Sequence, residues 1–147
     1  MKEVPKRIQT MRTIVAASSL GPAECGAIDR ELQLIATAQS VKDQHRRSLL
    51  AVLHTTRALD TTARSLLLLH GIPLPSQPSL RTYLLRFENH SAVGVAHISY
   101  PQRKRFYRTI VKPRNRYMHT ASAFPSVLQE RTVLAEMQTC LTILVSL

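Results

Sequence analysis

The stretch "SVKDQHRRSLLAVLHTTRALDTTARSLLLLHGIP", residues 40–73, decides the fold class. Its apolar and small residues recur at spacings of three and four, the period of an amphipathic α-helix. They are Leu49, Val52, Leu53, Thr56, Leu59, Ala63, Leu66, Leu67 and His70. Ser40 opens an S-x-x-D pattern that predicts a capped start, and Gly71 followed by Pro73 predicts the end. We therefore expect one helix of about 30 residues, about 45 Å long, which forms the spine of a bundle.

Helical patterns continue on both sides of this spine. Residues 23–39 and 80–89 each place apolar side chains on one face, which predicts two further helices. The first 22 residues carry a weaker periodicity around Ile8, Met11 and Val15, which fits either a short packed helix or an arm.

The C-terminal third has clear start signals for helices. Pro101 suits the first turn of a basic helix that runs to about Lys112, and Pro113 either kinks or restarts it. Ser126 and Gln129 form a second capping box ahead of a last apolar helix. Residues 90–101 fit a strand, a loop or a loose helix, and we favour a loop with a short turn. Together these patterns predict an all-α fold, a four- to five-helix antiparallel bundle.

Composition narrows the class of protein. A chain of 147 residues with 44% hydrophobic residues fits a single domain, residues 1–147. No apolar run approaches the roughly 18–20 residues that span a membrane. Cys25 and Cys140 belong to no CxxC pair, and the serine-interrupted start is a poor signal peptide, so we expect a reducing, cytoplasmic location. No metal or cofactor motif is present in the sequence, and we expect neither.

Charge predicts an acidic partner. The formal net charge is +11, and most of the 20 basic residues are arginines, whose planar guanidinium suits phosphate. No Asp or Glu occurs between Glu88 and Glu130. Within that gap we expect nucleic-acid contacts from Arg103, Lys104, Arg105, Arg108, Lys112, Arg116 and Tyr117. Of the aromatic residues there, Phe106 fits the core better than a base-stacking position.

The segment "RNRYMH", residues 114–119, adds chemistry to this charge. On a helix Asn115 and His119 share a face, and Arg114 at the first turn after Pro113 can swing toward them. An imidazole can move a proton near neutral pH, and a guanidinium can stabilise the charge of a phosphoryl transition state. Asn115 can orient the imidazole or hold a phosphate oxygen. The sequence places no carboxylate near this segment, which disfavours two-metal nuclease chemistry.

Arg114, Asn115 and His119 resemble the R-N-x3-H signature of the HEPN (higher eukaryotes and prokaryotes nucleotide-binding) superfamily. The resemblance implies a helical bundle, usually a homodimer, in which two copies of the motif form one composite, metal-independent ribonuclease site. Arg114 and His119 would be catalytic and Asn115 the polar helper. It also implies a prokaryotic toxin–antitoxin, CRISPR-linked or phage-defence role, with an antitoxin or sensor protein as a further partner. Ala121 stands where a subset of the toxins has a tyrosine that the antitoxin modifies, so control through that tyrosine is not implied.

Three functions stay open at this point. The first is an endoribonuclease that acts through attack of the ribose 2′-hydroxyl on the adjacent phosphate. The second is a basic helical module that binds nucleic acid or a nucleotide without cleaving it. The third is a structural subunit whose basic face docks an acidic protein.

Overall fold

The computed structural model describes residues 3–90 and 97–145, and every regular element in this part of the chain is helical. The α-helices are α1 (Glu3–Ala16), α2 (Pro22–Ala38), α3 (Gln44–Leu69), α4 (Leu80–Asn89), α5 (Tyr100–Phe106), α6 (Lys112–His119) and α7 (Val127–Val145). A π-helical turn, η1 (Tyr107–Val111), joins α5 to α6. The all-α prediction is confirmed. Because α5, η1 and α6 run on as one basic rod, the described chain forms six helical rods rather than four or five.

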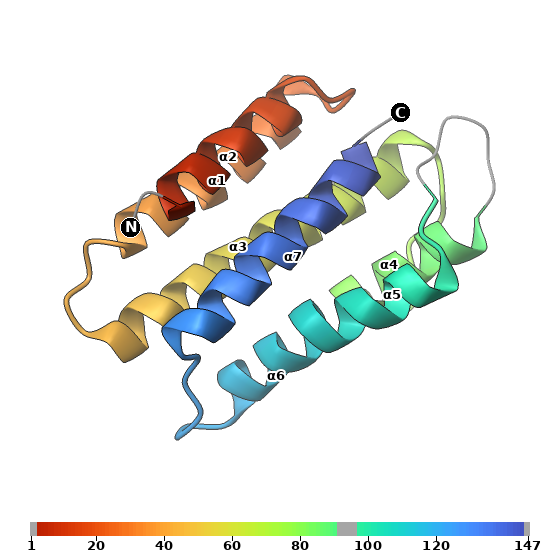
Figure 1. The fold of residues 1–147 in the computed structure, drawn as a ribbon. Coiled ribbons are helices and arrows are strands. Elements are labelled where there is room, and N and C mark those ends of the chain that lie inside the picture. The colour runs from red at the N-terminus through yellow and green to blue at the C-terminus, as the bar shows by residue number, and fades with distance from the viewer. Residues whose placement is uncertain (1–2, 91–96, 146–147) are drawn as a thin grey trace.

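The rods stack in three layers (Figure 1). α3 and α7 lie side by side in the middle, α1 and α2 cover one side of them, and α4 and the basic rod cover the other. The main core lies between these layers, and its largest fully buried side chains include Phe87, Phe106, Met11 and Leu59. Phe106 is therefore a core residue, as the sequence predicted.

The central helix α3 is shorter than predicted because it starts later. Its N-cap is Asp43, whose carboxylate accepts from the His45 N–H at 3.1 Å. The prediction of Ser40 as the cap is wrong, since its hydroxyl donates to the Thr37 carbonyl at 2.8 Å. α3 therefore has 26 residues and is about 39 Å long at 1.5 Å per residue.

The other end of α3 is as predicted. Gly71 has a φ of +69°, the left-handed conformation that glycine adopts without steric penalty. The Ile72 N–H donates to the Leu67 carbonyl at 2.9 Å and the Gly71 N–H to the Leu68 carbonyl at 3.1 Å. This pair of hydrogen bonds is the Schellman motif, which closes the last turn of a helix.

The N-terminal segment is a helix and not an arm. Val4, Ile8, Met11 and Val15 of α1 are buried at the spacing of a helical face. Arg7 also donates to the Gln138 side chain of α7 at 3.0 Å. This extra helix is the reason that the predicted number of helices was too low.

Two capping boxes mark the N-terminal starts of the basic rod and of α7. Ser99 and Gln102 cap α5, and Ser126 and Gln129 cap the start of α7, with a Gln129 N–H to Ser126 Oγ distance of 3.1 Å. The second of these confirms the predicted capping box. Leu128 of α7 is 74% exposed, although the sequence predicts an apolar helix here. In the ambiguous stretch 90–101, residues 91–96 lie outside the described residues.

Pro113 continues the rod because η1 precedes it. Proline has no N–H to donate, and its ring clashes with the carbonyl four residues back in a regular α-helix. Here the Lys112 N–H donates to the Tyr107 carbonyl five residues back, so the turn is wider ahead of the proline. Pro113 then occupies the first turn of α6, the part of a helix in which proline is best tolerated. Arg114 therefore lies in the first turn of α6, three residues after the π-helical turn ends at Val111.

Candidate nucleic-acid site

The predicted motif lies on α6, the short last segment of the basic rod. Arg114 is half-buried, and its Nη1 donates to the Asn115 Oδ1 at 3.1 Å. His119 is the last residue of the helix and is exposed. Asn115 thus orients Arg114 within one chain, while its predicted roles toward the imidazole or a phosphate stay predictions.

Arg114 and Asn115 line a cleft of about 560 Å³ between α3, α4 and α6. This volume lies within the usual range of small-molecule sites. The cleft is lined by Thr56, Arg57, Asp60, Thr61, Pro78, Ser79, Leu80, Arg81, Val111, Arg114 and Asn115. His119 is not among the lining residues, so the structure brings together two of the three predicted catalytic residues here.

The three arginines of the cleft differ in their partners. Arg57 Nη2 lies 3.1 Å from Glu31 Oε1 and is therefore already neutralised in part. Arg81 is exposed, and its guanidinium carbon lies 5.4 Å from the centre of the Tyr107 ring. Within residues 3–90 and 97–145, neither Arg81 nor Arg114 has a carboxylate at ion-pair distance. These two cations are available to an anion.

One carboxylate reaches the cleft from a distant part of the sequence. Asp60 of α3 is half-buried, and burial raises its pKa even though the nearby charges of Arg114 and Arg64 act to lower it. In the part of the chain that the structure describes, Asp60 makes neither a hydrogen bond nor an ion pair. The expectation that no carboxylate lies near the motif is wrong, because the fold brings α3 against α6.

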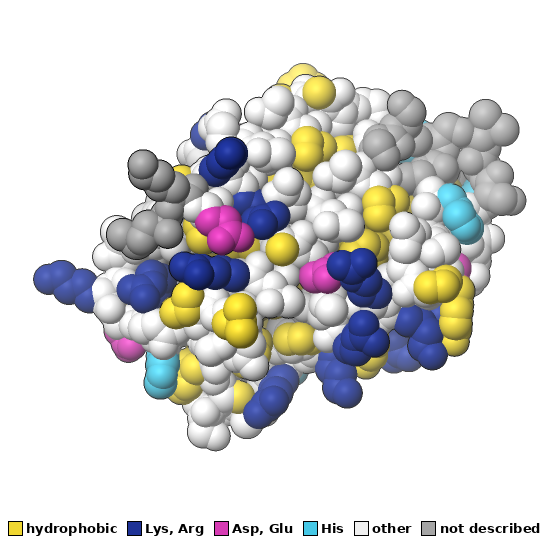
Figure 2. Space-filling model, viewed as in Figure 1, with side chains coloured by type: hydrophobic (Ala, Val, Ile, Leu, Met, Phe, Trp, Pro, Cys, Tyr) yellow, Lys and Arg dark blue, Asp and Glu magenta, His cyan; other side chains and the backbone are white. Residues whose placement is uncertain are grey.

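The basic rod is free of acidic residues in sequence but not in space. Arg103 pairs with Glu88 of α4, and Arg105 Nη2 lies 2.8 Å from Glu136 Oε1 of α7. The exposed cations of the rod that have no ion-pair partner among the described residues are Lys104, Arg108, Lys112 and Arg116. Dark blue side chains follow the edge of the molecule formed by the rod (Figure 2). Ion pairing therefore leaves a narrower basic surface than the sequence indicates.

The aromatic residues of this region also divide into two groups. Tyr117 is only 8% exposed and packs with Val52 and Val133, and burial raises the pKa of its phenol. Such a position argues against Tyr117 as a nucleic-acid contact. Tyr100 is 54% exposed, with Arg103 and Lys104 over its ring at 5.3 and 5.1 Å from its centre. Tyr100 is the ring that the rod presents to solvent.

A group of exposed apolar side chains follows His119 in the chain, at the start of α7. Phe124, Val127 and Leu128 are large apolar side chains that stay exposed, and we call them the apolar end. The Phe124 ring stacks on His45 at the start of α3, with 4.9 Å between ring centres. The exposed histidine of the motif is thus followed within nine residues by a small hydrophobic surface.

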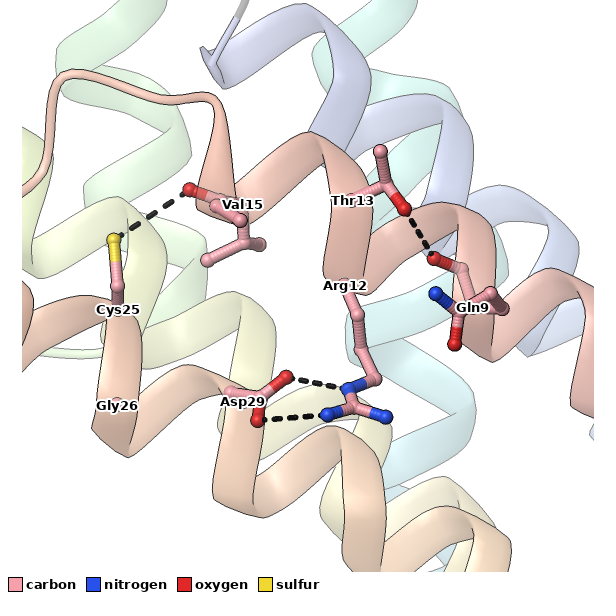
Figure 3. A pocket seen from close by; sticks show the side chains of 8 residues that line it. Gln9, Arg12, Thr13, Val15, Cys25, Gly26 and Asp29 are labelled. Atoms are coloured by element: carbon pink, nitrogen blue, oxygen red, sulfur yellow. Dashed lines mark hydrogen bonds and ion pairs between the residues drawn. The ribbon is translucent and has the colours of Figure 1, made fainter.

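A second cavity, of about 450 Å³, lies between α1 and α2 (Figure 3). Arg12 Nε and Nη2 donate to the two oxygens of Asp29 at 2.6 and 3.3 Å, and this contact lowers the Asp29 pKa. The Cys25 thiol donates to the Val15 carbonyl at 3.5 Å. The charged groups in this view pair with each other, and only the exposed Gln9 amide is drawn without a partner, which favours a gap in packing over a binding site.

Two broader findings frame the site. No helix within residues 3–90 and 97–145 is both long and apolar enough to cross a membrane. In the same residues, no three His, Cys, Asp or Glu side chains lie together in a way that would hold a metal ion.

Sequence reasoning missed Asp60 and Arg81 as site residues. Asp60 and Arg81 occur in ordinary amphipathic helices, and only the packing of α3 and α4 against α6 brings them to Arg114.

Comparison of the chain with protein-family models, with curated proteins and with solved structures gives no match to any of them.

Proposed function

We propose that this protein is a metal-independent endoribonuclease of the HEPN type that acts as a homodimer. The observation that carries the proposal is the placement of Arg114 and His119 on one short helix. The start of α6 lines a cationic cleft, and its end presents an exposed imidazole. A phosphate and a proton-transfer group therefore have places on the same element.

The chemistry needs two proton transfers. The ribose 2′-oxygen attacks the adjacent phosphorus as its proton passes to a neutral imidazole. The bond from phosphorus to the 5′-oxygen breaks as that oxygen takes a proton from an imidazolium. The products are a 2′,3′-cyclic phosphate, which hydrolyses to a 3′-phosphate, and a 5′-hydroxyl. Arg114 stabilises the additional negative charge on the phosphorane-like transition state.

A second copy of the chain supplies the second imidazole. Each copy carries one His119, whereas the reaction uses one proton acceptor and one proton donor. The apolar end, formed by Phe124, Val127 and Leu128, follows His119 and is exposed. Burial of such side chains stabilises an interface by about 25 cal/mol per Å² of apolar area. An interface there would bring two copies of α6 close to one another.

The basic rod gives the RNA strand its path. Lys104, Arg108, Lys112 and Arg116 are exposed along the elements that lead to the motif. Each phosphate that they contact adds about −0.7 to the logarithmic salt dependence of single-strand binding. The wider setting is that of a toxin or phage-defence nuclease, in which an antitoxin or sensor protein regulates the activity.

The test is cleavage of total RNA by the purified protein in EDTA. We expect products with 5′-hydroxyl ends, and we expect His119→Ala to slow cleavage about 10²- to 10⁴-fold. His70→Ala is the matched control. It removes a histidine at the C-terminal end of α3, outside the cleft, and should cleave like wild type. Dimers with one His119→Ala subunit should also lose most of their activity. Complete inhibition by EDTA, or full activity of His119→Ala, would contradict the proposal.

One observation favours the second function, a module that binds RNA without cleaving it. His119 does not line the cleft that holds Arg114, so a single chain presents no assembled acid–base pair. The same experiment separates the two functions. Salt-dependent RNA binding with no cleavage product, unchanged in His119→Ala, would establish the binding module.

A further inference from the structure

We propose that Asp60 and Arg81 make the cleft between α3, α4 and α6 a subsite for one ribonucleotide. Arg81 and Arg114 hold its 5′-phosphate, and Asp60 accepts a hydrogen bond from its ribose 2′-hydroxyl. This inference rests on the proposed function, because the phosphate at Arg114 is then the scissile one. The nucleotide in the cleft is the one on the 3′ side of the cut.

The first support is the state of the charges. Arg81 and Arg114 come from α4 and α6, and neither has a carboxylate partner among the described residues. Arg57, on the third wall, is held by Glu31 at 3.1 Å. Two guanidinium groups without an ion-pair partner that line one cleft suit a phosphate, since the parallel N–H groups of a guanidinium can donate to two phosphate oxygens.

The second support is the position of Asp60. Arg114 is close enough to act on the pKa of Asp60, yet the two side chains form no ion pair. A ribose between a phosphate on Arg114 and the Asp60 carboxylate would occupy that separation. Burial raises the pKa of Asp60, and carboxylates perturbed in this way concentrate at functional sites. A ribose hydroxyl in the cleft would give Asp60 a hydrogen-bond donor that no described residue provides.

The third support is the apolar wall of the cleft. Pro78, Leu80 and Val111 line it beside the polar groups. Nucleotides need a surface of this mixed kind, with an apolar face for the base or sugar ring and a few polar groups that fix the orientation. An inorganic anion would use the arginines but would have no use for Asp60 or for this wall.

Asp60 would then discriminate RNA from DNA. The 2′-hydroxyl is the group by which a protein distinguishes the two at a given position. Asp60 is a specificity residue in this arrangement and takes no part in proton transfer. Arg81 is a binding residue for the same nucleotide.

The experiment measures binding of the four nucleoside 5′-monophosphates and their 2′-deoxy forms to the full chain by calorimetry, in EDTA. We expect ribonucleotides to bind about tenfold more tightly than deoxyribonucleotides, the size of a hydrogen bond to a charged group. Asp60→Ala should bring this ratio close to one. Arg81→Ala should weaken both forms about tenfold and leave the ratio unchanged. Arg86→Ala, which removes the same charge from an exposed position of α4 outside the cleft, is the matched control.

The ratio of the two affinities is measured within each variant, so a general loss of folding does not imitate the expected result. Equal affinity of the wild type for both forms, or a ratio that survives Asp60→Ala, would overturn the role of Asp60. An Arg81→Ala variant that binds like Arg86→Ala would overturn the role of Arg81. Inorganic phosphate that competes as strongly as a nucleotide would overturn the ribonucleotide subsite as a whole.

Failure of this inference and failure of the proposed function are distinguishable, because mononucleotide binding requires no cleavage. RNA cleavage that depends on His119, without the ribose preference, would overturn the subsite alone. Ribose-selective binding without RNA cleavage would overturn the nuclease alone.

Discussion

The cavity between α1 and α2 and the cleft between α3, α4 and α6 are similar in size but differ in how their charges are paired. In the cavity between α1 and α2, Arg12 and Asp29 satisfy each other at 2.6 Å. In the cleft between α3, α4 and α6, Arg114 and Asp60 lie near each other without pairing. The difference teaches that the presence of charged residues does not mark a site. Charges that the fold leaves without partners do, because a ligand can still satisfy them.

The largest expected difference between the two cavities is in RNA cleavage after removal of an arginine from each. Arg114→Ala should reduce the rate about 10²- to 10³-fold, the usual loss when one group that stabilises transition-state charge is removed. Arg12→Ala removes an arginine from the other cavity and should leave the rate unchanged. Single-turnover cleavage of a labelled RNA measures both variants. Equal losses in the two would mean that overall positive charge, and not the cleft, supports the activity.

A smaller effect is expected in the salt dependence of RNA binding. Arg81→Ala should make the logarithmic slope shallower by about 0.7, the contribution of one phosphate contact on a single strand. Arg12→Ala should leave the slope as in wild type, because its guanidinium already has a carboxylate partner. Binding of unmodified RNA across a range of salt concentrations, with His119→Ala as the common background to slow cleavage, gives the slopes. An unchanged slope in Arg81→Ala would place the RNA outside the cleft.

Local signals in the sequence were sufficient for most of the fold. The Ser126–Gln129 capping box and the glycine at the end of α3 involve residues a few positions apart, so their geometry follows from the sequence alone. The predicted start of α3 was wrong because "SVKD" contains two residues that are both good N-caps. Sequence does not tell which of Ser40 and Asp43 the chain uses.

The buried face of α3 also differs from the apolar pattern. Thr55 and Thr62 are fully buried, and their hydroxyls donate to the Ala51 and Ala58 carbonyls of the same helix at 2.6 and 2.7 Å. A threonine that satisfies its own hydroxyl in this way behaves as a small core residue. Hydropathy patterns miss such positions because they score the hydroxyl as polar.

The candidate site was predictable only in part, because the rest of it is tertiary. The motif residues Arg114 and Asn115 do reach a cleft, and their spacing on one helix was readable from the sequence. The ion pairs of Arg103 and Arg105, and the approach of Asp60 to Arg114, join residues that are at least 15 positions apart. No local pattern encodes those contacts, so the sequence overstated the free positive charge and missed the carboxylate.

The smallest expected effect is on stability, and here the two cavities should respond with opposite signs. The hydrogen bond from Arg12 lowers the pKa of Asp29, so this group stabilises the fold above its unfolded pKa, about 3.9. That stabilisation is lost as the pH falls through the lowered folded value. Asp29→Asn should therefore melt slightly lower than wild type at pH 7 and like wild type in strong acid. Because the Arg12–Asp29 pair is partly exposed, the difference should be small and should decrease in high salt.

Burial raises the pKa of Asp60, which reverses the sign. The folded state binds the proton more tightly than the unfolded state, so ionisation of Asp60 destabilises the fold as the pH rises from about 3.9 through the raised value. Asp60→Asn should melt higher than wild type at pH 7, and this gain should vanish below about pH 3.9. Thermal melts of both variants across pH 3 to 8 make the comparison. A lower melting temperature for Asp60→Asn at pH 7 would mean that Asp60 supports the fold, as Asp29 does, and that its place in the cleft needs no ligand to explain it.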